Sequence, residues 1–190
     1  YIVFSPSSFA PEELEVEIFG KGIDAAQSFG DASPKQGVLE RAKNGTLVID
    51  EVAGLPADIQ TKLLKTLATN KFKRVGHDKE YNLECRIIST TSKDMQAEIA
   101  EGRFKGDLYS RLSVVPVEMP SLKERRDDIP ALCEYFVNAY AAMTNKPVKK
   151  VSDEALSVLQ SYEWPGNISQ LRNIIEWLMI MSKNDSDVIN

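Results

Sequence analysis

The feature that most constrains the fold is a set of short apolar runs that do not alternate with polar residues. These runs occupy residues 1–4, 46–49, 85–91 and 114–117. Near-continuous apolar strands are typical of parallel sheets, because both faces of such sheets are covered. Helical patterns lie between the later runs, so the sequence predicts an α/β layer with these four segments as strands.

Two helices are predicted around these runs. One segment has apolar residues at the spacing of a single helix face: Ile59, Leu63, Leu64 and Leu67. A second helix should begin at Pro11, which is followed by Glu12 and Glu13. Proline suits the first turn of a helix, and carboxylates there interact favourably with the positive end of the helix dipole.

The composition changes abruptly between residues 120 and 130, where the sequence LKERRDD occurs. Strand-like runs end there, and three helical patterns follow. The first begins at Ile129, the second follows Ser152 as a predicted N-cap, and the third follows Asn167. We therefore expect an α/β core over residues 1–124 and a small helical domain over residues 125–190.

Length and composition indicate a folded protein. The chain has 190 residues, of which 43% are hydrophobic and 27% charged, and this disfavours disorder and coiled coil. A net charge of −5 argues against a module that binds nucleic acid through bulk positive charge. The cysteine pair, Cys85 and Cys133, fits a reducing compartment, and we expect a cytoplasmic protein with no membrane span. Because the sequence opens directly on an apolar run without Met, we expect it to be part of a longer chain.

The most informative motif is Thr46–Ile49 followed by Asp50 and Glu51. In a parallel sheet, ligands bind outside the carboxyl ends of the strands, so carboxylates there face a ligand. One carboxylate can hold Mg²⁺ while its neighbour orients or activates a water for attack on a phosphoryl group. The residues alone equally allow Asp50 to cap the following helix or turn.

The order of motifs along nearly the whole chain resembles the central AAA+ ATPase domain of bacterial sigma-54-dependent transcriptional activators, and most of all response regulators of the NtrC and NtrX type. The matching segments include EIFG at 17–20, GTLVIDE at 45–51, FKRVG at 72–76, GRF at 102–104, DLYSRL at 107–112, RRDDIP at 125–130 and WPGN at 164–167. The resemblance implies a P-loop NTPase-like fold, with a three-layer parallel sheet followed by a helical lid. WPGN matches the activator lid and argues against a protease-associated, protein-remodelling AAA+ protein.

The resemblance also implies roles for particular residues. Asp50 corresponds to the Walker B aspartate that supports Mg²⁺, and Glu51 to the glutamate that polarises the hydrolytic water. Arg111 corresponds to an arginine finger that reaches the ATP of a neighbouring subunit, which implies a homo-oligomer, from a dimer to a hexameric ring. Without the resemblance, a surface ion pair between Arg111 and Asp107 would be the favoured interpretation.

Two family motifs are absent from the sequence. The Walker A loop, GxxxxGK[ST], does not occur; in the family it lies just upstream of the strand that here is residues 1–4. We therefore expect the phosphate cradle and the central strand of the sheet to be missing from this chain. The loop between Gly20 and Gly37 lacks GAFTGA, which puts contact with the sigma-54 RNA polymerase holoenzyme in doubt. This loop often departs in proteins of the NtrX type.

Several nucleotide-binding positions of the family are changed. Serine replaces a switch asparagine at Ser5, the sensor I asparagine at Ser92 and the sensor II arginine at Ser169, and Lys105 replaces a second arginine. Lysine keeps the positive charge of arginine but lacks its planar guanidinium group, and serine at position 169 has neither. Serine in place of asparagine lacks the amide donor. The alternative function is therefore a degenerate AAA+ domain that acts without ATP hydrolysis or sigma-54 contact. In either case the family implies DNA binding and a sensor kinase through domains outside this chain.

Three smaller features receive structural interpretations. His77 lies in a predicted exposed turn without a second metal ligand nearby, so we expect neither a metal nor a catalytic role. Trp164 and Trp177 are expected to fill the core of the helical domain. The basic residues Lys71, Lys73 and Arg74 are more consistent with a solvated face than with a DNA contact.

Overall fold

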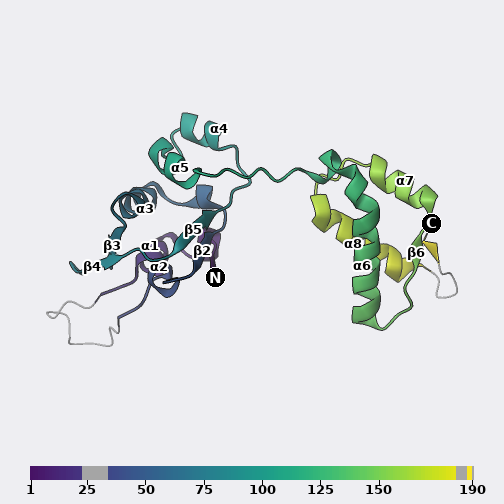
Figure 1. The fold of residues 1–190 in the computed structure, drawn as a ribbon, viewed down its shortest axis with the longest axis horizontal. Coiled ribbons are helices and arrows are strands. Elements are labelled where there is room, and N and C mark those ends of the chain that lie inside the picture. Colours follow the sequence, from purple (N-terminus) through teal and green to yellow (C-terminus); the bar gives the residue numbers. More distant parts are fainter. Residues whose placement is uncertain (23–33, 183–187, 190) are drawn as a thin grey trace. The chain divides into compact units, whose positions relative to one another are not determined.

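The chain folds into two compact units, Tyr1–Pro116 and Val117–Asn190. The structure is a computed structural model that describes residues 1–22, 34–182 and 188–189 (Figure 1). Most of the loop expected at residues 21–36, including the position at which GAFTGA occurs in the family, lies outside the described residues. Each unit is described by itself.

The first unit is built on a parallel sheet of β1 (Ile2–Phe4), β2 (Thr46–Ile49) and β5 (Arg86–Ser89), in the order β1-β2-β5. In the register, Phe4 lies beside Ile49, and Ile49 lies beside Ser89. The predicted strands at 1–4, 46–49 and 85–91 are thus confirmed, with slightly shorter bounds for the first and third. The α/β class and the parallel sheet are confirmed as well.

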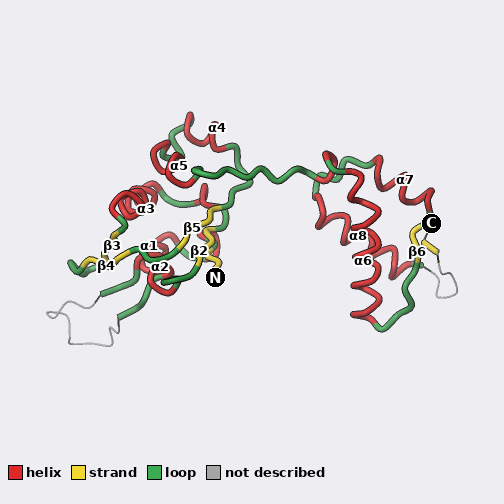
Figure 2. The backbone as a smooth tube through the Cα atoms, viewed as in Figure 1, coloured by secondary structure: helices red, strands yellow, loops and turns green. Residues whose placement is uncertain are grey.

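Helices connect these strands (Figure 2). They are α1 (Pro11–Phe19), α2 (Val38–Arg41), α3 (Ala57–Thr69), α4 (Met95–Ala100) and α5 (Gly106–Leu112), with 3₁₀ turns η1 (Pro6–Ser8) and η3 (Val52–Gly54). The predicted start at Pro11 is confirmed, and the predicted apolar face of α3 buries Ile59 and Leu63. These side chains share a core with Leu47 of β2 and Leu108 of α5, all within 1% exposure.

A short antiparallel hairpin of β3 (Lys71–Lys73) and β4 (Glu80–Asn82) follows α3. These strands were not predicted from the sequence, because only Phe72 of β3 is buried and a single apolar position gives no periodic signal. Phe72 stacks on Tyr81 across the hairpin, with ring centroids 5.8 Å apart.

The prediction of a fourth strand at residues 114–117 is wrong. This segment is irregular in the structure, and Val114, Val115 and Val117 are each at least three-quarters exposed. A short apolar run becomes a strand only when a neighbouring strand accepts its backbone hydrogen bonds. Within the described part of the chain, this segment pairs with no strand, since the sheet contains only β1, β2 and β5.

The second unit consists mainly of helices. It contains η4 (Leu122–Glu124), η5 (Arg126–Asp128), α6 (Ile129–Thr144), α7 (Asp153–Ser161) and α8 (Asn167–Met181), with the short parallel pair β6 (Lys150–Val151) and β7 (Val188–Ile189). The three predicted helices are confirmed. The Ser152 hydroxyl accepts a hydrogen bond from the Ala155 N–H at 3.2 Å, as expected of an N-cap.

Trp164 lies in the core of the second unit, but Trp177 does not. Trp164 is 2% exposed, and its indole N–H donates to the Leu159 carbonyl at 2.7 Å. The buried residues of α8 are Leu171, Ile175 and Met179, one helical turn apart. Trp177 falls between them on the opposite side of the helix and is 57% exposed, so its predicted core position is wrong.

Residues 117–124 group with the second unit in the structure, whereas the sequence analysis assigned residues 1–124 to the core. The reason is local: Leu122 of η4 is fully buried in the helical core, and its N–H donates to the Asn167 side chain at 2.8 Å. Among the described residues, no helix is long and apolar enough to cross a membrane.

We predict that Ile175→Ala destabilises the second unit by about 2–5 kcal/mol, because it leaves a cavity in a packed core. The matched control is Ile180→Ala on the same helix, where the side chain is 58% exposed and the change should stay within about 0.5 kcal/mol. Urea unfolding, with hydrogen exchange over α6 and α8 as the readout, measures both. Equal losses in the two variants would contradict this account of the core.

Candidate functional site

The two acidic residues follow β2 at the carboxyl edge of the sheet. The Asp50 N–H donates to the Phe4 carbonyl at 2.8 Å, and the Thr90 N–H donates to the Ile49 carbonyl at 2.9 Å. These bonds extend both ladders of the sheet beyond the last residues of the strands. The ends of β1, β2 and β5 therefore meet around Asp50, as the parallel arrangement requires.

Asp50 and Thr90 are in direct contact. The Thr90 hydroxyl donates to Asp50 Oδ1 at 2.7 Å, and the same hydroxyl oxygen accepts the Glu51 N–H at 3.2 Å. The carboxylate therefore points across the sheet edge toward β5. Within the described residues, the turn η3 that follows has no side-chain cap, so Asp50 does not act as its cap. Sequence reasoning did not single out Thr90, although its position directly after an apolar strand was a usable signal.

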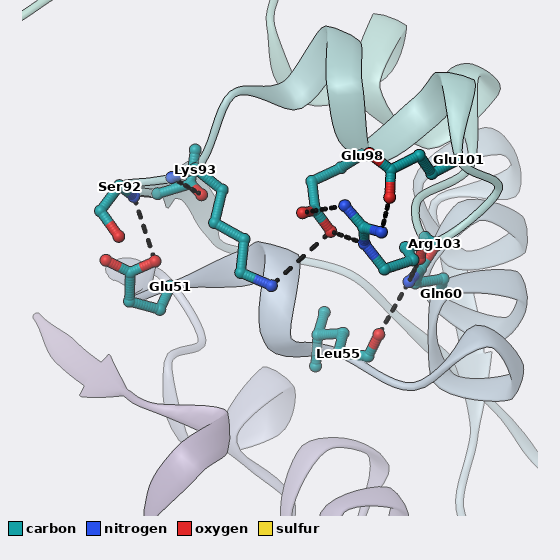
Figure 3. Close-up of polar contacts among 9 residues, drawn as sticks. Glu51, Leu55, Gln60, Ser92, Lys93, Glu98, Glu101 and Arg103 are labelled. Carbon is teal, nitrogen blue, oxygen red and sulfur yellow. Dashed lines mark hydrogen bonds and ion pairs between the residues drawn. The ribbon is translucent and has the colours of Figure 1, made fainter.

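Glu51 has an unusual backbone conformation. Its φ and ψ are both 54°, in the left-handed region that costs a residue other than glycine about 1–3 kcal/mol. The Ser92 N–H donates to Glu51 Oε2 at 3.1 Å (Figure 3). The Val52 N–H donates to the Thr90 carbonyl at 2.9 Å. The structure thus holds the Glu51 carboxylate beside the segment after β5. Strain of this kind is common at functional sites.

These residues suit a magnesium ion that arrives with a phosphate ligand. Mg²⁺ prefers oxygen ligands and is usually held by one or two carboxylates together with substrate phosphates. Asp50 and Glu51 supply such oxygens. The described residues contain no group of three or more His, Cys, Asp or Glu side chains that could form an all-protein metal cage.

An ion pair joins the buried Glu98 of α4 to the exposed Arg103, which follows the helix. Glu98 is 6% exposed and accepts two hydrogen bonds from Arg103, each 2.9 Å long. These hydrogen bonds hold the pKa of Glu98 below its usual value and raise the pKa of Arg103. The Lys93 ammonium nitrogen lies 3.6 Å from Glu98 Oε2, the same oxygen that accepts from Arg103 Nε (Figure 3). The pair was not predicted, because nothing in a single sequence marks Glu98 as buried.

Gln60 of α3 is the other polar side chain buried near this segment, at 1% exposure. Its amide nitrogen donates to the carbonyls of Leu55 at 2.7 Å and Arg103 at 2.9 Å. Its amide oxygen accepts the Lys105 N–H at 3.0 Å. Gln60 therefore satisfies backbone groups both after η3 and just before α5.

The two predicted basic site residues both belong to α5. Lys105 is its N-cap and Arg111 lies in its last turn, and both are exposed. In the described part of the molecule, Arg111 forms no ion pair with Asp107, the partner that the alternative interpretation required. Neither residue contacts Asp50 or Glu51 within this chain by any hydrogen bond or ion pair among the described residues.

Three predicted positions remain, and all three are serines. Ser92 contacts Glu51 through its backbone N–H rather than its hydroxyl. Ser5 follows β1, and its hydroxyl contacts that of Ser7 at 3.1 Å. Ser169 is exposed in the first turn of α8, in the second unit.

The basic cluster lies along a groove of about 830 Å³ between α3 and the β3–β4 hairpin, away from the acidic pair. Lys71 pairs with Glu80, Lys73 with Asp78, and Arg74 with Glu40. Arg74 makes the tightest of these contacts, with a guanidinium nitrogen 2.6 Å from the carboxylate. Since each of the three cations already has an acidic partner, the cluster is a paired surface.

Comparison with known proteins gives the same two parts. A family model described as the sigma-54 interaction domain matches residues 1–118, and one described as the AAA+ ATPase lid domain matches residues 123–190. The nitrogen assimilation regulatory protein NtrX of Azorhizobium caulinodans is 41% identical over 187 residues, which make up 98% of this chain and 40% of that protein.

Solved structures agree with this comparison. Crystal structures of NtrX from Brucella abortus in complex with ADP and with ATP match with TM-scores of 0.87 and identities of 40% and 39%. Each match covers 100% of this chain and 41% of the other. The chain therefore spans about two-fifths of the length of these relatives. With both parts matched over nearly all of its length, this chain belongs to the sigma-54 interaction domain family and carries the AAA+ ATPase lid domain after it.

Proposed function

We propose that this chain binds ATP with Mg²⁺ and hydrolyses it at a site shared between subunits, as the central domain of a sigma-54-type transcriptional regulator in the cytoplasm. The observation that carries the proposal is the position of Asp50 and Glu51 at the meeting carboxyl ends of β1, β2 and β5. In parallel α/β sheets this edge is where ligands bind. The crystal structures of NtrX with ADP and with ATP support a nucleotide as the ligand.

Asp50 is the residue proposed to hold Mg²⁺, directly or through water. The Thr90 hydroxyl engages only one of its oxygens, Oδ1, and orients the carboxylate. A Mg²⁺ held there would supply positive charge to offset the negative charge of the phosphate groups. Thr90 fixes the carboxylate in place before any ligand arrives, which reduces the ordering that binding requires.

Glu51 is proposed to orient and polarise the water that attacks the γ-phosphate. Its Oε2 is held by the Ser92 N–H, which leaves Oε1 for a water. Because the donor is a main-chain N–H, this hydrogen bond does not need the asparagine that the family has at position 92. The side chain of Glu51, whose backbone is left-handed, reaches the segment after β5, where it meets the Ser92 N–H.

Arg111 and Lys105 are proposed to act on the nucleotide of a neighbouring subunit. Both are exposed on α5 and lack a bond to the acidic pair of their own chain among the described residues. An arginine in that role stabilises charge on the transferred phosphoryl group. The function therefore requires a homo-oligomer, a dimer or a ring. Ser169 stands at the position of the family's sensor II arginine, and its role in nucleotide binding stays a prediction.

A second candidate is a domain that binds nucleotide and assembles but does not hydrolyse it, within a DNA-binding response regulator. It is favoured by Ser92, Lys105 and Ser169, which lack the amide or guanidinium groups of the family. Contact with the sigma-54 holoenzyme is not part of either proposal, since GAFTGA is absent. DNA and a sensor kinase would act through segments outside this chain.

We predict that Glu51→Gln in the intact protein lowers phosphate release by about 10²–10⁴-fold, because the amide cannot act as a base toward water. ATP affinity, measured by isothermal titration, should stay within a few-fold. Glu101→Gln, which changes an exposed acid of the same unit, is the control and should keep full activity. Equal phosphate release by the wild type and Glu51→Gln would favour the second candidate function. Absence of ATP binding would contradict both candidate functions.

We predict that Arg111→Ala lowers hydrolysis by about 10³–10⁵-fold with little change in ATP affinity. Arg172→Ala, an exposed arginine of α8, is the control. Mixing Arg111→Ala with Glu51→Gln subunits should restore activity at about one quarter of the interfaces, where an intact pocket meets an intact arginine. A mixture as inactive as its two components would rule out action in trans.

A further inference from the structure

All three hydrogen bonds of the Gln60 side chain among the described residues go to backbone groups of two separate segments. Its side chain is among the least exposed polar groups in the described residues, and it forms no side-chain to side-chain bond there. A buried amide left without partners costs about 1–3 kcal/mol, so a polar residue at this depth needs the bonds that it makes. The bonds identify which parts of the chain Gln60 holds together.

The first segment is the approach to α5. Gln60 bonds the Arg103 carbonyl and the Lys105 N–H, the backbone groups on either side of Phe104. This is the pairing that a neighbouring strand would make with residues two apart. Phe104 is itself buried at 3%, so this stretch is fixed by its side chain and by its backbone. The helix that starts from it carries Arg111.

The second segment is the turn after the acidic pair. Gln60 bonds the Leu55 carbonyl at the C-cap of η3, which begins directly after Glu51. Leu55 is buried at 3%, and the Val52 N–H of the same turn is bonded to the Thr90 carbonyl. One amide thus connects the turn that follows the acids to the start of the arginine-bearing helix (Figure 3).

We propose that Gln60 is a positioning residue for the hydrolysis reaction: by clamping the backbone before α5 to the turn after Glu51, it sets where Arg111 reaches the neighbouring subunit's nucleotide. This inference rests on the proposed function. Gln60 does not touch the nucleotide; it acts through the placement of α5. A misplacement of about 1 Å at a reacting group can cost on the order of 10²-fold in rate, so loss of the clamp should be visible in turnover.

The test uses Gln60→Met in the intact protein, which keeps the side-chain length and removes all the hydrogen bonds. We expect kcat for ATP hydrolysis to fall by about 10–100-fold, while the Kd for ATP changes less than about threefold. Thr66→Val is the matched control: Thr66 is buried at 2% on the same helix, and its hydroxyl bonds only the Lys62 carbonyl within that helix. It should keep the wild-type kcat.

Mixed assemblies distinguish positioning from a general loss of structure. Gln60→Met retains its own acidic pair, so mixing it with Glu51→Gln should restore hydrolysis, whereas mixing it with Arg111→Ala should not. Activity in the second mixture but not in the first would place the defect at the acids and overturn the proposal. A Thr66→Val defect equal to that of Gln60→Met would also overturn it.

If Gln60→Met does not fold, a second variant, Gln60→Glu, tests the same proposal. In Gln60→Glu the carboxylate can still accept the Lys105 N–H but cannot donate to the two carbonyls, and protonation returns one donor. Burial beside carbonyl oxygens favours the protonated form. We expect the ratio of variant to wild-type kcat to rise as the pH falls from about 8.5 to 6; a ratio independent of pH overturns the proposal. Wild-type protein with no hydrolysis would instead overturn the proposed function itself.

Discussion

The parallel backbone pairing of β1, β2 and β5 is the constraint on which the rest of the first unit depends. Parallel strands end at the same edge, so residues far apart in the sequence meet there: Phe4, Asp50 and Thr90 are joined by backbone and side-chain bonds at this edge. The pairing continues one residue beyond the strands, which fixes Asp50 by its own N–H. The conformation of Glu51 follows from the need of the chain to turn sharply into η3 directly afterwards.

Around this edge, the side chains of Thr90 and Gln60 form hydrogen bonds mainly with backbone groups. Thr90 uses its hydroxyl toward Asp50 and toward the Glu51 N–H, and Gln60 uses its amide toward three backbone groups. Backbone positions are thereby set without long, flexible side chains, whose ordering would cost conformational entropy. Lys105 and Arg111 lie exposed at the two ends of α5, and the pair of the buried Glu98 with Arg103 ties α4 to the chain that leads into α5.

How far the sequence predicts the structure varies with the kind of signal. Ile59 and Leu63 repeat at helical spacing, and the three sheet strands are dense apolar runs, so local pattern located these elements. The run at 114–117 has the same composition, yet it is irregular, because a strand needs a paired neighbour and no strand of the described sheet pairs with it. Trp177 shows the same limit, since composition suggested burial but the face of α8 occupied by Leu171 and Ile175 decided otherwise.

The sequence by itself determined the α/β class, the helical second part, the acidic pair after β2 and the family motifs that carry the candidate roles. These are properties of short segments, and short segments keep their periodicity and order wherever they lie. Only the tertiary structure decided that Thr90 orients Asp50, that a main-chain N–H holds Glu51, and that Gln60 joins two distant segments. Such contacts depend on which strands are neighbours and on how deeply each side chain is buried, and the local sequence determines neither.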